Sequence, residues 1–317
     1  RTRIALTLNG LPAVIDWIAP ALGSPATFSV VSIGDKTILT RYGLSSSGLS
    51  LFVGLTQAAF GTFVVLFVPL NSVDFTAVVV GIGAGVSQGL GLALMFFMLK
   101  RAEVSRVIPV FQTSPIFVAI MAIAFLGDEI NPWQALAIAF AVFGAVLASS
   151  TRRNGHGWAS GFRPDPRFAL LLLAAAMVGG SQILIDISAD DIELWNTVTL
   201  RGWGMAAVAL AVFARPSTIA DLARYFRTGR TSGLLFFTEG VLAVSAALLL
   251  IIAISRGPVA LVGALFGARP AFLFIITLTM NRVAPGFLDE SFQRDELVIK
   301  FMATAFVVTA IVLIAVS

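Results

Sequence analysis

The chain has 317 residues, of which 58% are apolar and 12% charged, and its 21 Lys and Arg against 17 Asp and Glu give a net charge of only +4. Soluble domains carry about 45–50% apolar and about 25% charged residues, so this composition indicates a chain whose main solvent is lipid. With no Cys and one His, the sequence excludes disulfides, thiolate nucleophiles and Cys- or His-based metal centres, and the small net charge gives no reason to expect a nucleic-acid partner.

Apolar stretches of about 20 residues recur along the whole chain, separated by Gly, Pro and clusters of charge. Such a stretch is long enough to cross a bilayer as a helix, and these are apolar on all sides rather than alternating as barrel strands would. The sequence therefore predicts an all-α integral membrane protein with ten transmembrane helices. In chain order the predicted spans are Trp17–Leu39, Ser47–Val68, Phe75–Leu99, Val104–Leu126, Pro132–Ser149, Phe168–Ala189, Leu194–Ala214, Thr231–Ser255, Val259–Met280 and Leu297–Val316.

The segments between the spans are short, which leaves no room for a soluble domain. Residues Ile4–Ile15 are expected to form an interfacial lead-in to the first span. The three longest connections, Ser150–Pro166, Arg215–Arg230 and Asn281–Glu296, are polar and are expected to be surface loops. This divides the chain into a five-helix unit over residues 1–150, a basic connecting loop over 151–166, and a second five-helix unit over 167–317.

The two halves carry an internal repeat. A shift of 155 residues aligns Lys100–Phe117 with Ser255–Phe272 and gives six identical positions. The identical pairs are Arg101 and Arg256, Val104 and Val259, Val107 and Val262, Phe111 and Phe266, Pro115 and Pro270, and Phe117 and Phe272. Because five is an odd number of spans, the second half enters the membrane from the opposite face, and the repeat is predicted to be inverted, as in many transporters.

The stretch Ala102–Ser149, containing RVIPVFQTSPIFVAIMAIAFLGDEINPWQALAIAFAVFGAVLA, resembles the EamA module of the drug/metabolite transporter superfamily. In that module a Pro-bearing stretch is followed by a Leu-Gly-Glu turn and a Gly-containing helix, and here Glu129 takes the acidic position. The second half replaces the turn by Leu288-Asp289-Glu290 within a longer loop. The resemblance implies a ten-helix secondary transporter but no particular substrate, because the superfamily moves amino acids, nucleotide sugars, cations and drugs.

Two charges are predicted near the middle of the membrane. Arg269 lies in the middle of its span, directly before Pro270, and Glu239 lies roughly 13 Å deep in another span. A charge at such depth costs at least ~2.5–3.5 kcal/mol, which favours a functional role. We expect Arg269 to bind a carboxylate and Glu239 a proton or an ammonium group; a buried ion pair that only locks two helices together is the alternative. Pro115 and Pro270 predict matched kinks flanking a cavity.

Three further charges lie nearer the ends of their spans. Arg201 occupies the position that matches Gln57 in the first half and resembles a basic residue of the second EamA helix; it is either a ligand or a snorkelling interfacial residue. Asp35 and Asp186 end the first helix of each half. They are expected to act as gates or coupling sites, with solvation among the headgroups as the alternative.

Uncharged residues complete the predicted site. Four amides fall inside apolar spans, where they favour a shared wet cavity over isolated interhelical contacts because of their number. They are Gln57, Gln88, Gln112 and Gln182. Gly81, Gly85 and Gly89 recur every four residues and predict a smooth helix face that another backbone can approach closely.

The distribution of basic residues predicts an orientation. Outside the buried positions, sixteen Lys and Arg fall on one side of the membrane and three, Arg1, Arg3 and Arg256, on the side of the termini. The positive-inside rule then places both termini outside the cytoplasm. The family resemblance implies cytoplasmic termini, so the two arguments disagree.

Together these features predict a multi-pass secondary transporter of the plasma or inner membrane that moves a small polar or amphipathic metabolite by alternating access. The leading expectation is an exporter of amino acids or related metabolites. It is expected to work as a monomer or homodimer in membrane lipid, and protons are the candidate coupling ion. No cofactor is expected. The alternatives are an intramembrane enzyme that modifies lipid headgroups and a membrane scaffold that transports nothing.

Overall fold

The computed structural model describes residues 13–70, 74–99, 107, 110–149, 166–227, 230–283 and 294–316, and all regular structure within them is helical. Five described helices are long and apolar enough to cross a membrane, and a sixth span is added if one sharply bent pair is counted as a single span. Three shorter apolar helices accompany them. The predicted all-α membrane class is therefore supported, whereas length and composition of the described helices do not by themselves give ten spans.

The first helices of the chain follow the predicted spans closely. The long helix α1 carries Pro20, Pro25 and several charges, so it is less apolar than an ordinary span. The bounds in this half are α1 (Ala13–Thr40), α2 (Ser46–Val65), α3 (Phe75–Leu99), α5 (Ser114–Met121), the π-helical segment η1 (Ala122–Leu126) and α6 (Pro132–Ser149). Gly127 follows η1 with a φ of 70°, a left-handed conformation that suits glycine and explains the Leu-Gly turn at this point.

The second half has more, shorter elements than predicted. The predicted span Thr231–Ser255 is continuous in space but contains a π-helical segment in its middle. The bounds are α7 (Pro166–Asp191), α8 (Leu194–Phe213), α9 (Pro216–Arg227), α10 (Arg230–Leu235), η3 (Phe236–Leu242), α11 (Ala243–Arg256), α12 (Val259–Phe266), α13 (Arg269–Val283) and α14 (Arg294–Val316).

Two predicted spans contain a short non-helical turn at corresponding places. Pro115 lies in the first turn of α5 and Pro270 in the first turn of α13, each directly after a short turn. Proline has no N–H to donate, so it fits the first turn of a new helix better than the interior of a long one. The helices are thus interrupted for a short turn before each of these prolines, although Val259–Met280 still counts as one candidate span.

One predicted loop is wrong, and three other segments with predictions lie mostly outside the described residues. Arg215–Arg230 was expected to be a surface loop, but it forms the helix α9, which leaves α8 at a bend of 111°. Pro216 starts this helix, and Arg224 and Arg227 lie in its last turn, where cations favour the helix dipole. Most of Ile4–Ile15, Ser150–Pro166 and Asn281–Glu296, including Leu288-Asp289-Glu290, lies outside the described residues.

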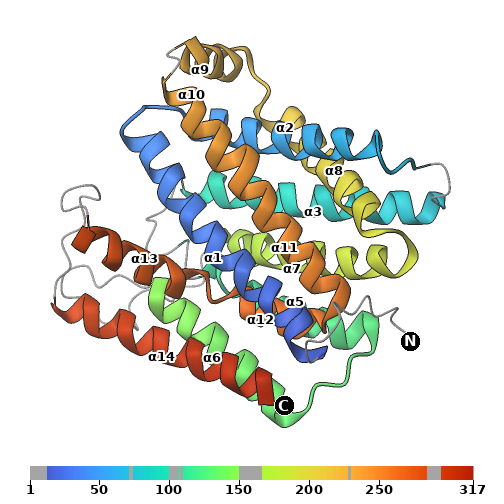
Figure 1. Ribbon diagram of the computed structural model, residues 1–317, viewed down its shortest axis with the longest axis vertical. Coiled ribbons are helices and arrows are strands. Elements are labelled where there is room, and N and C mark those ends of the chain that lie inside the picture. The colour runs from blue at the N-terminus through green and yellow to red at the C-terminus, as the bar shows by residue number, and fades with distance from the viewer. Residues whose placement is uncertain are drawn as a thin grey trace.

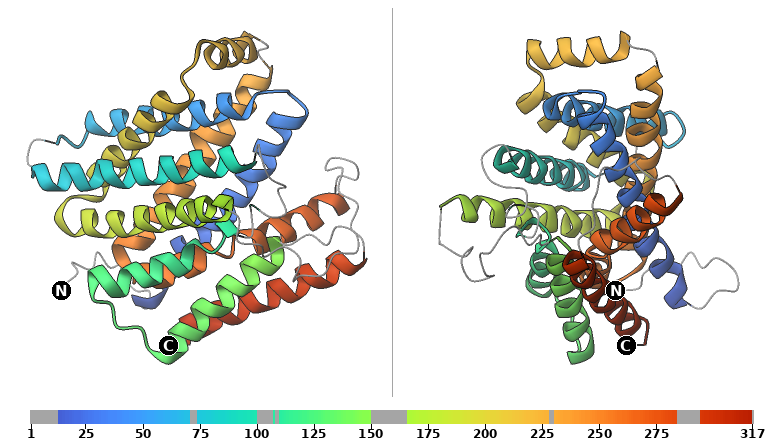
Figure 2. Two further views of the ribbon diagram at one scale, coloured as in Figure 1. Left: turned by 180° about the vertical axis from the view of Figure 1, so that it is seen from behind. Right: turned by 90° about the vertical axis from the view of Figure 1, so that its left-hand side faces the viewer.

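Helices from different parts of the chain pack side by side. α2 runs along α8, α3 along α7 and α8, α1 along α11, and α6 along α14. Figures 1 and 2 show the α6 and α14 pair at one end of the molecule and α9 at the other. A Cβ atom on Gly85 would overlap the main chain at Arg201, and Gly81 and Gly89 lie against Leu200 and Val208. The predicted glycine face is confirmed, and its partner is α8.

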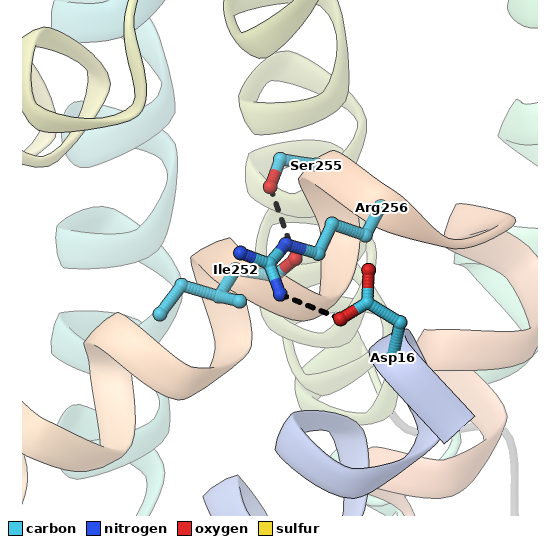
Figure 3. Close-up of polar contacts among 4 residues, drawn as sticks. All are labelled: Asp16, Ile252, Ser255 and Arg256. Atoms are coloured by element: carbon cyan, nitrogen blue, oxygen red, sulfur yellow. Dashed lines mark hydrogen bonds and ion pairs between the residues drawn. The ribbon is translucent and has the colours of Figure 1, made fainter. Parts of the chain in front are cut away.

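Polar contacts add to this packing at both ends and in the middle. The Ser24 hydroxyl donates to the Ala246 carbonyl at 2.8 Å, which joins α1 to α11. At the start of α1, the Arg256 guanidinium donates to the Asp16 carboxylate at 2.9 Å, as Figure 3 shows. These two contacts hold α1 against α11.

Candidate substrate cavity

A cavity of about 550 Å³ lies among the helices, with walls from α1, α2, α3, the start of α5 and the turn before it, α7, α8, η3, α11, the end of α12 and α13. This volume is within the usual range for sites that hold small organic molecules. Eight of the nine residues singled out from the sequence line it: Asp35, Gln57, Gln88, Gln112, Gln182, Arg201, Glu239 and Arg269. The ninth, Asp186, is buried within α7 and is not part of this lining.

An ionic cluster forms one side of the cavity. The carboxyl groups of Asp35 and Glu239 lie close to each other, and Arg269 lies close enough to attract both. Two neighbouring carboxyl groups repel each other when both are ionised, so a proton on one of them, or a cation beside them, stabilises the arrangement. The predicted approach of Arg269 to Glu239 is therefore observed with Asp35 as a third member, which the sequence did not place there.

Two residues of α1 hold the Arg269 side chain. Its Nη2 donates to the Ser32 hydroxyl at 2.7 Å, and its guanidinium lies over the Phe28 ring, with Cζ 5.2 Å from the ring centre. The Ser29 hydroxyl donates to the Arg269 carbonyl at 2.9 Å. Sequence reasoning missed Phe28 and Ser32, although their spacing from Asp35 puts all three on one face of a helix, which is a signal that could have found them.

Local backbone features bring the two carboxyl groups together. Glu239 lies in the middle of η3, and π-helical segments often occur at functional sites because they shift one side chain out of the regular register. Opposite it, Gly34 lets α1 approach closely: a Cβ atom there would lie 2.6 Å from Cγ2 of Thr238. Asp35 and Glu239, each next to one of these contact residues, therefore face each other across the seam.

Arg201 lies on a different wall, contributed by α8. Its side chain is 5% exposed, and its Nε has no hydrogen-bond partner. The next residue, Gly202, packs against the Gln57 carbonyl, so α2 and α8 cross at this point. A snorkelling interfacial position, one of the two readings of Arg201, does not fit so buried a side chain.

The four amides share the same cavity, although they come from four separate segments. Gln57 and Gln182 are buried, and Oε1 of Gln182 has no hydrogen-bond partner. Gln88 and Gln112 are partly exposed to the cavity. Much of the remaining wall is apolar and includes six phenylalanines: Phe28, Phe96, Phe111, Phe213, Phe266 and Phe274. Such a lining suits a ligand with an apolar body and a few polar groups.

Several apolar helices long enough to cross a membrane surround this cavity, as expected of a multi-pass membrane protein. Residues 21–150 match the EamA-like transporter family. Over these residues, which are less than half of the chain, the match confirms the resemblance to the EamA module found in the sequence.

Two further similarities to known proteins are found. Over 162 residues the chain is 28% identical to a protein of Rhizobium johnstonii described as a riboflavin transporter. That alignment covers 45% of this chain and 50% of the relative, so it spans half of the relative's length. A protein of known crystal structure is 19% identical and superposes with a TM-score of 0.64 over 95% of this chain and 94% of its own, which shows a shared fold.

Proposed function

We propose that the chain is a secondary active transporter of the plasma or inner membrane, built from two inverted five-helix halves over residues 1–150 and 167–317. In this proposal, rocking of one half against the other opens the cavity to each side of the membrane in turn. The observation that carries it is the cavity itself, because charged and amide side chains from both halves meet in one buried space. Such groups are costly in a membrane unless they serve a solute or an ion.

The pairing of the helices supports two equivalent halves. α2 packs on α8 and α6 on α14, which joins elements of the same rank in the two units. The contact of α1 with α11 has its counterpart in the contact of α7 with α3, and the Pro115 and Pro270 breaks occupy matching positions. An inverted repeat accounts for all of these pairings at once.

The lining favours a small amphipathic metabolite with an aromatic body. Six phenylalanines and four glutamines would pack on and hydrogen-bond to a planar heterocycle. The relative described as a riboflavin transporter favours the same kind of solute. Amino acids, moved outward, are the second substrate class, since the cavity holds both guanidinium and carboxyl groups, which suit a carboxylate and an ammonium group.

Transport is coupled to protons through the Asp35 and Glu239 pair in this proposal. Two carboxyl groups so close together repel each other when both are ionised, so the pair is suited to take up one proton, and Arg269 lies beside them. A cycle in which the pair loads and unloads this proton as the cavity changes sides would exchange protons for substrate.

Flux into proteoliposomes with an imposed pH gradient tests the proposal, with riboflavin and tryptophan as probes. We expect Glu239→Gln to lose gradient-driven flux while remaining folded, because the amide cannot exchange a proton. Asp190→Asn, which removes an exposed carboxylate at the end of α7, is the matched control and should keep full flux. Equal flux in Glu239→Gln and the wild type would refute proton coupling, and no flux of any probe in the wild type would leave only a scaffold.

A further inference from the structure

The two buried arginines of the cavity differ in their surroundings. Arg269 lies beside Asp35 and Glu239, donates to Ser32 and covers the ring of Phe28. Its positive charge is therefore balanced within the protein. Sequence reasoning assigned Arg269 as the anchor for a substrate anion, but this balance leaves it little reason to bind one.

Arg201 has no such partners among the described residues. Its Nε is buried without a hydrogen bond, and neither an ion pair with it nor the attraction of a nearby carboxylate is found in the described part of the chain. Burying an unpaired guanidinium is among the most costly arrangements in a protein. A structural arginine would have gained an acidic partner or turned toward the surface.

The backbone around Arg201 fixes it where it is. Gly85 of α3 packs directly on the Arg201 main chain, and the neighbouring Gly202 packs on the Gln57 carbonyl of α2. Both contacts involve main-chain atoms, so α8 is clamped between two helices at this residue. The side chain therefore cannot be carried to the surface by a small shift of its helix and stays on the cavity wall.

We propose that Arg201 binds the anionic group of the transported metabolite, a carboxylate or a phosphate monoester; this rests on the proposal that the cavity is the substrate site. A guanidinium presents planar, paired donors that match both oxyanions. Gln57 and Gln182 line the same cavity and offer amide donors to remaining oxygens, while the phenylalanines pack on the apolar body. The substrate is thus an amphipathic organic anion, and the Asp35, Glu239 and Arg269 cluster is left for the proton.

Binding of two matched probe pairs to the purified full-length protein tests this site. Flavin mononucleotide and riboflavin differ by a phosphate monoester, and tryptophan and tryptophanamide differ by a carboxylate. We expect one anionic member to bind at least about tenfold more tightly than its neutral partner in thermal-shift titrations. The pair that shows the preference identifies which oxyanion is recognised.

Variants at the two arginines separate this site from the ionic cluster. Arg201→Gln should abolish the preference for the anion and leave binding of the neutral partner within about twofold, whereas Arg201→Lys should keep part of it. Arg256→Gln, which removes an arginine outside the cavity, should change neither. Because Arg201 is unpaired, Arg201→Gln should also raise the melting temperature of the ligand-free protein, which a structural arginine would not do.

Three results would overturn the inference: equal binding within both probe pairs, a preference that survives in Arg201→Gln, or unfolding of the ligand-free Arg201→Gln variant. Failure of the transport proposal is seen separately, as anion binding through Arg201 without any flux in proteoliposomes. Flux without anion preference would keep the transporter and reject the role of Arg201.

Discussion

Two helix pairs line opposite parts of the cavity and are built alike but charged differently. α1 pairs with η3 and α11, and α3 pairs with α7. Each pair is joined by a serine hydroxyl that donates to a carbonyl of the other helix at 2.8 Å, Ser24 to Ala246 in one and Ser181 to Ala84 in the other.

The difference lies in the polar groups that these pairs turn to the cavity. The α1 pair contributes Asp35 and Glu239, whereas the α3 pair contributes Gln88 and Gln182. The α3 and α7 pair packs closely although it turns amides rather than carboxyl groups to the cavity, so carboxyl groups facing the cavity are not needed for such packing. This comparison supports a functional role for Asp35 and Glu239 over that of a structural ion pair.

The largest loss of stability is expected from crowding the contact between α3 and α7. A Cβ atom on Gly91 would lie 2.9 Å from the Ala174 carbonyl and 2.8 Å from Cγ2 of Val178. Gly91→Ala therefore forces α3 away from α7 and should lower the free energy of unfolding by about 1–3 kcal/mol, with loss of flux as the cavity deforms. Thermal unfolding in detergent and proteoliposome flux measure both effects.

Gly83 is the matched control for this change, since it is on the same helix and seam. Its nearest neighbour would be Cδ1 of Leu184 at 3.7 Å, an ordinary contact. Gly83→Ala should leave stability unchanged or raise it by up to ~1 kcal/mol through helix propensity. Equal losses of stability in the two variants would show that the contact between α3 and α7 tolerates no added methyl group at either position. The effect would then not be specific to Gly91.

A smaller and more local loss of stability is expected from crowding the contact between α1 and η3. Gly34→Ala places a Cβ atom 2.6 Å from Cγ2 of Thr238, a side-chain atom that can move more easily than a main-chain carbonyl. We expect a loss of stability of about 1 kcal/mol and a clear loss of gradient-driven flux, because Asp35 is pushed away from Glu239. Flux should recover in the Gly34→Ala, Thr238→Ala double variant, in which the crowding methyl group is absent. A double variant as inactive as Gly34→Ala alone would mean that Gly34 serves something other than close approach.

The sequence predicts the features that are set within one helix, but not those that need a contact between helices far apart in the chain. The Gly81, Gly85 and Gly89 face depends only on positions along a helix, and the structure agrees with it. The meeting of Asp35 with Glu239 depends on a contact between helices far apart in the chain, which no local pattern reports. Its one local sign, Gly34 beside Asp35, is meaningful only once η3 is known to pass there.

Polarity and hydropathy also gave wrong predictions of where some helices start and stop. Arg215–Arg230 is polar enough for a loop, yet its polar and apolar residues follow the helical period, and α9 buries Thr218 and Tyr225 on one side. The stretches around Pro115 and Pro270 are apolar enough for continuous spans, but each proline starts a new helix. Hydropathy alone does not distinguish a broken span from an intact one.

The smallest effect is expected from the ion pair between Asp16 and Arg256, at the far end of the α1 and α11 contact. The pair is charged, as the Asp35 and Glu239 cluster is, but it lies outside the cavity, and its side chains are 14% and 29% exposed. Asp16→Asn should cost at most about 1 kcal/mol and leave flux unchanged, since partly exposed pairs contribute little. A loss of flux comparable to that of Glu239→Gln, measured in the same proteoliposomes, would show that charge anywhere along α1 matters to transport. In that case the contrast between the two helix pairs would reflect the requirements of α1 as a whole rather than a site formed by Asp35, Glu239 and Arg269.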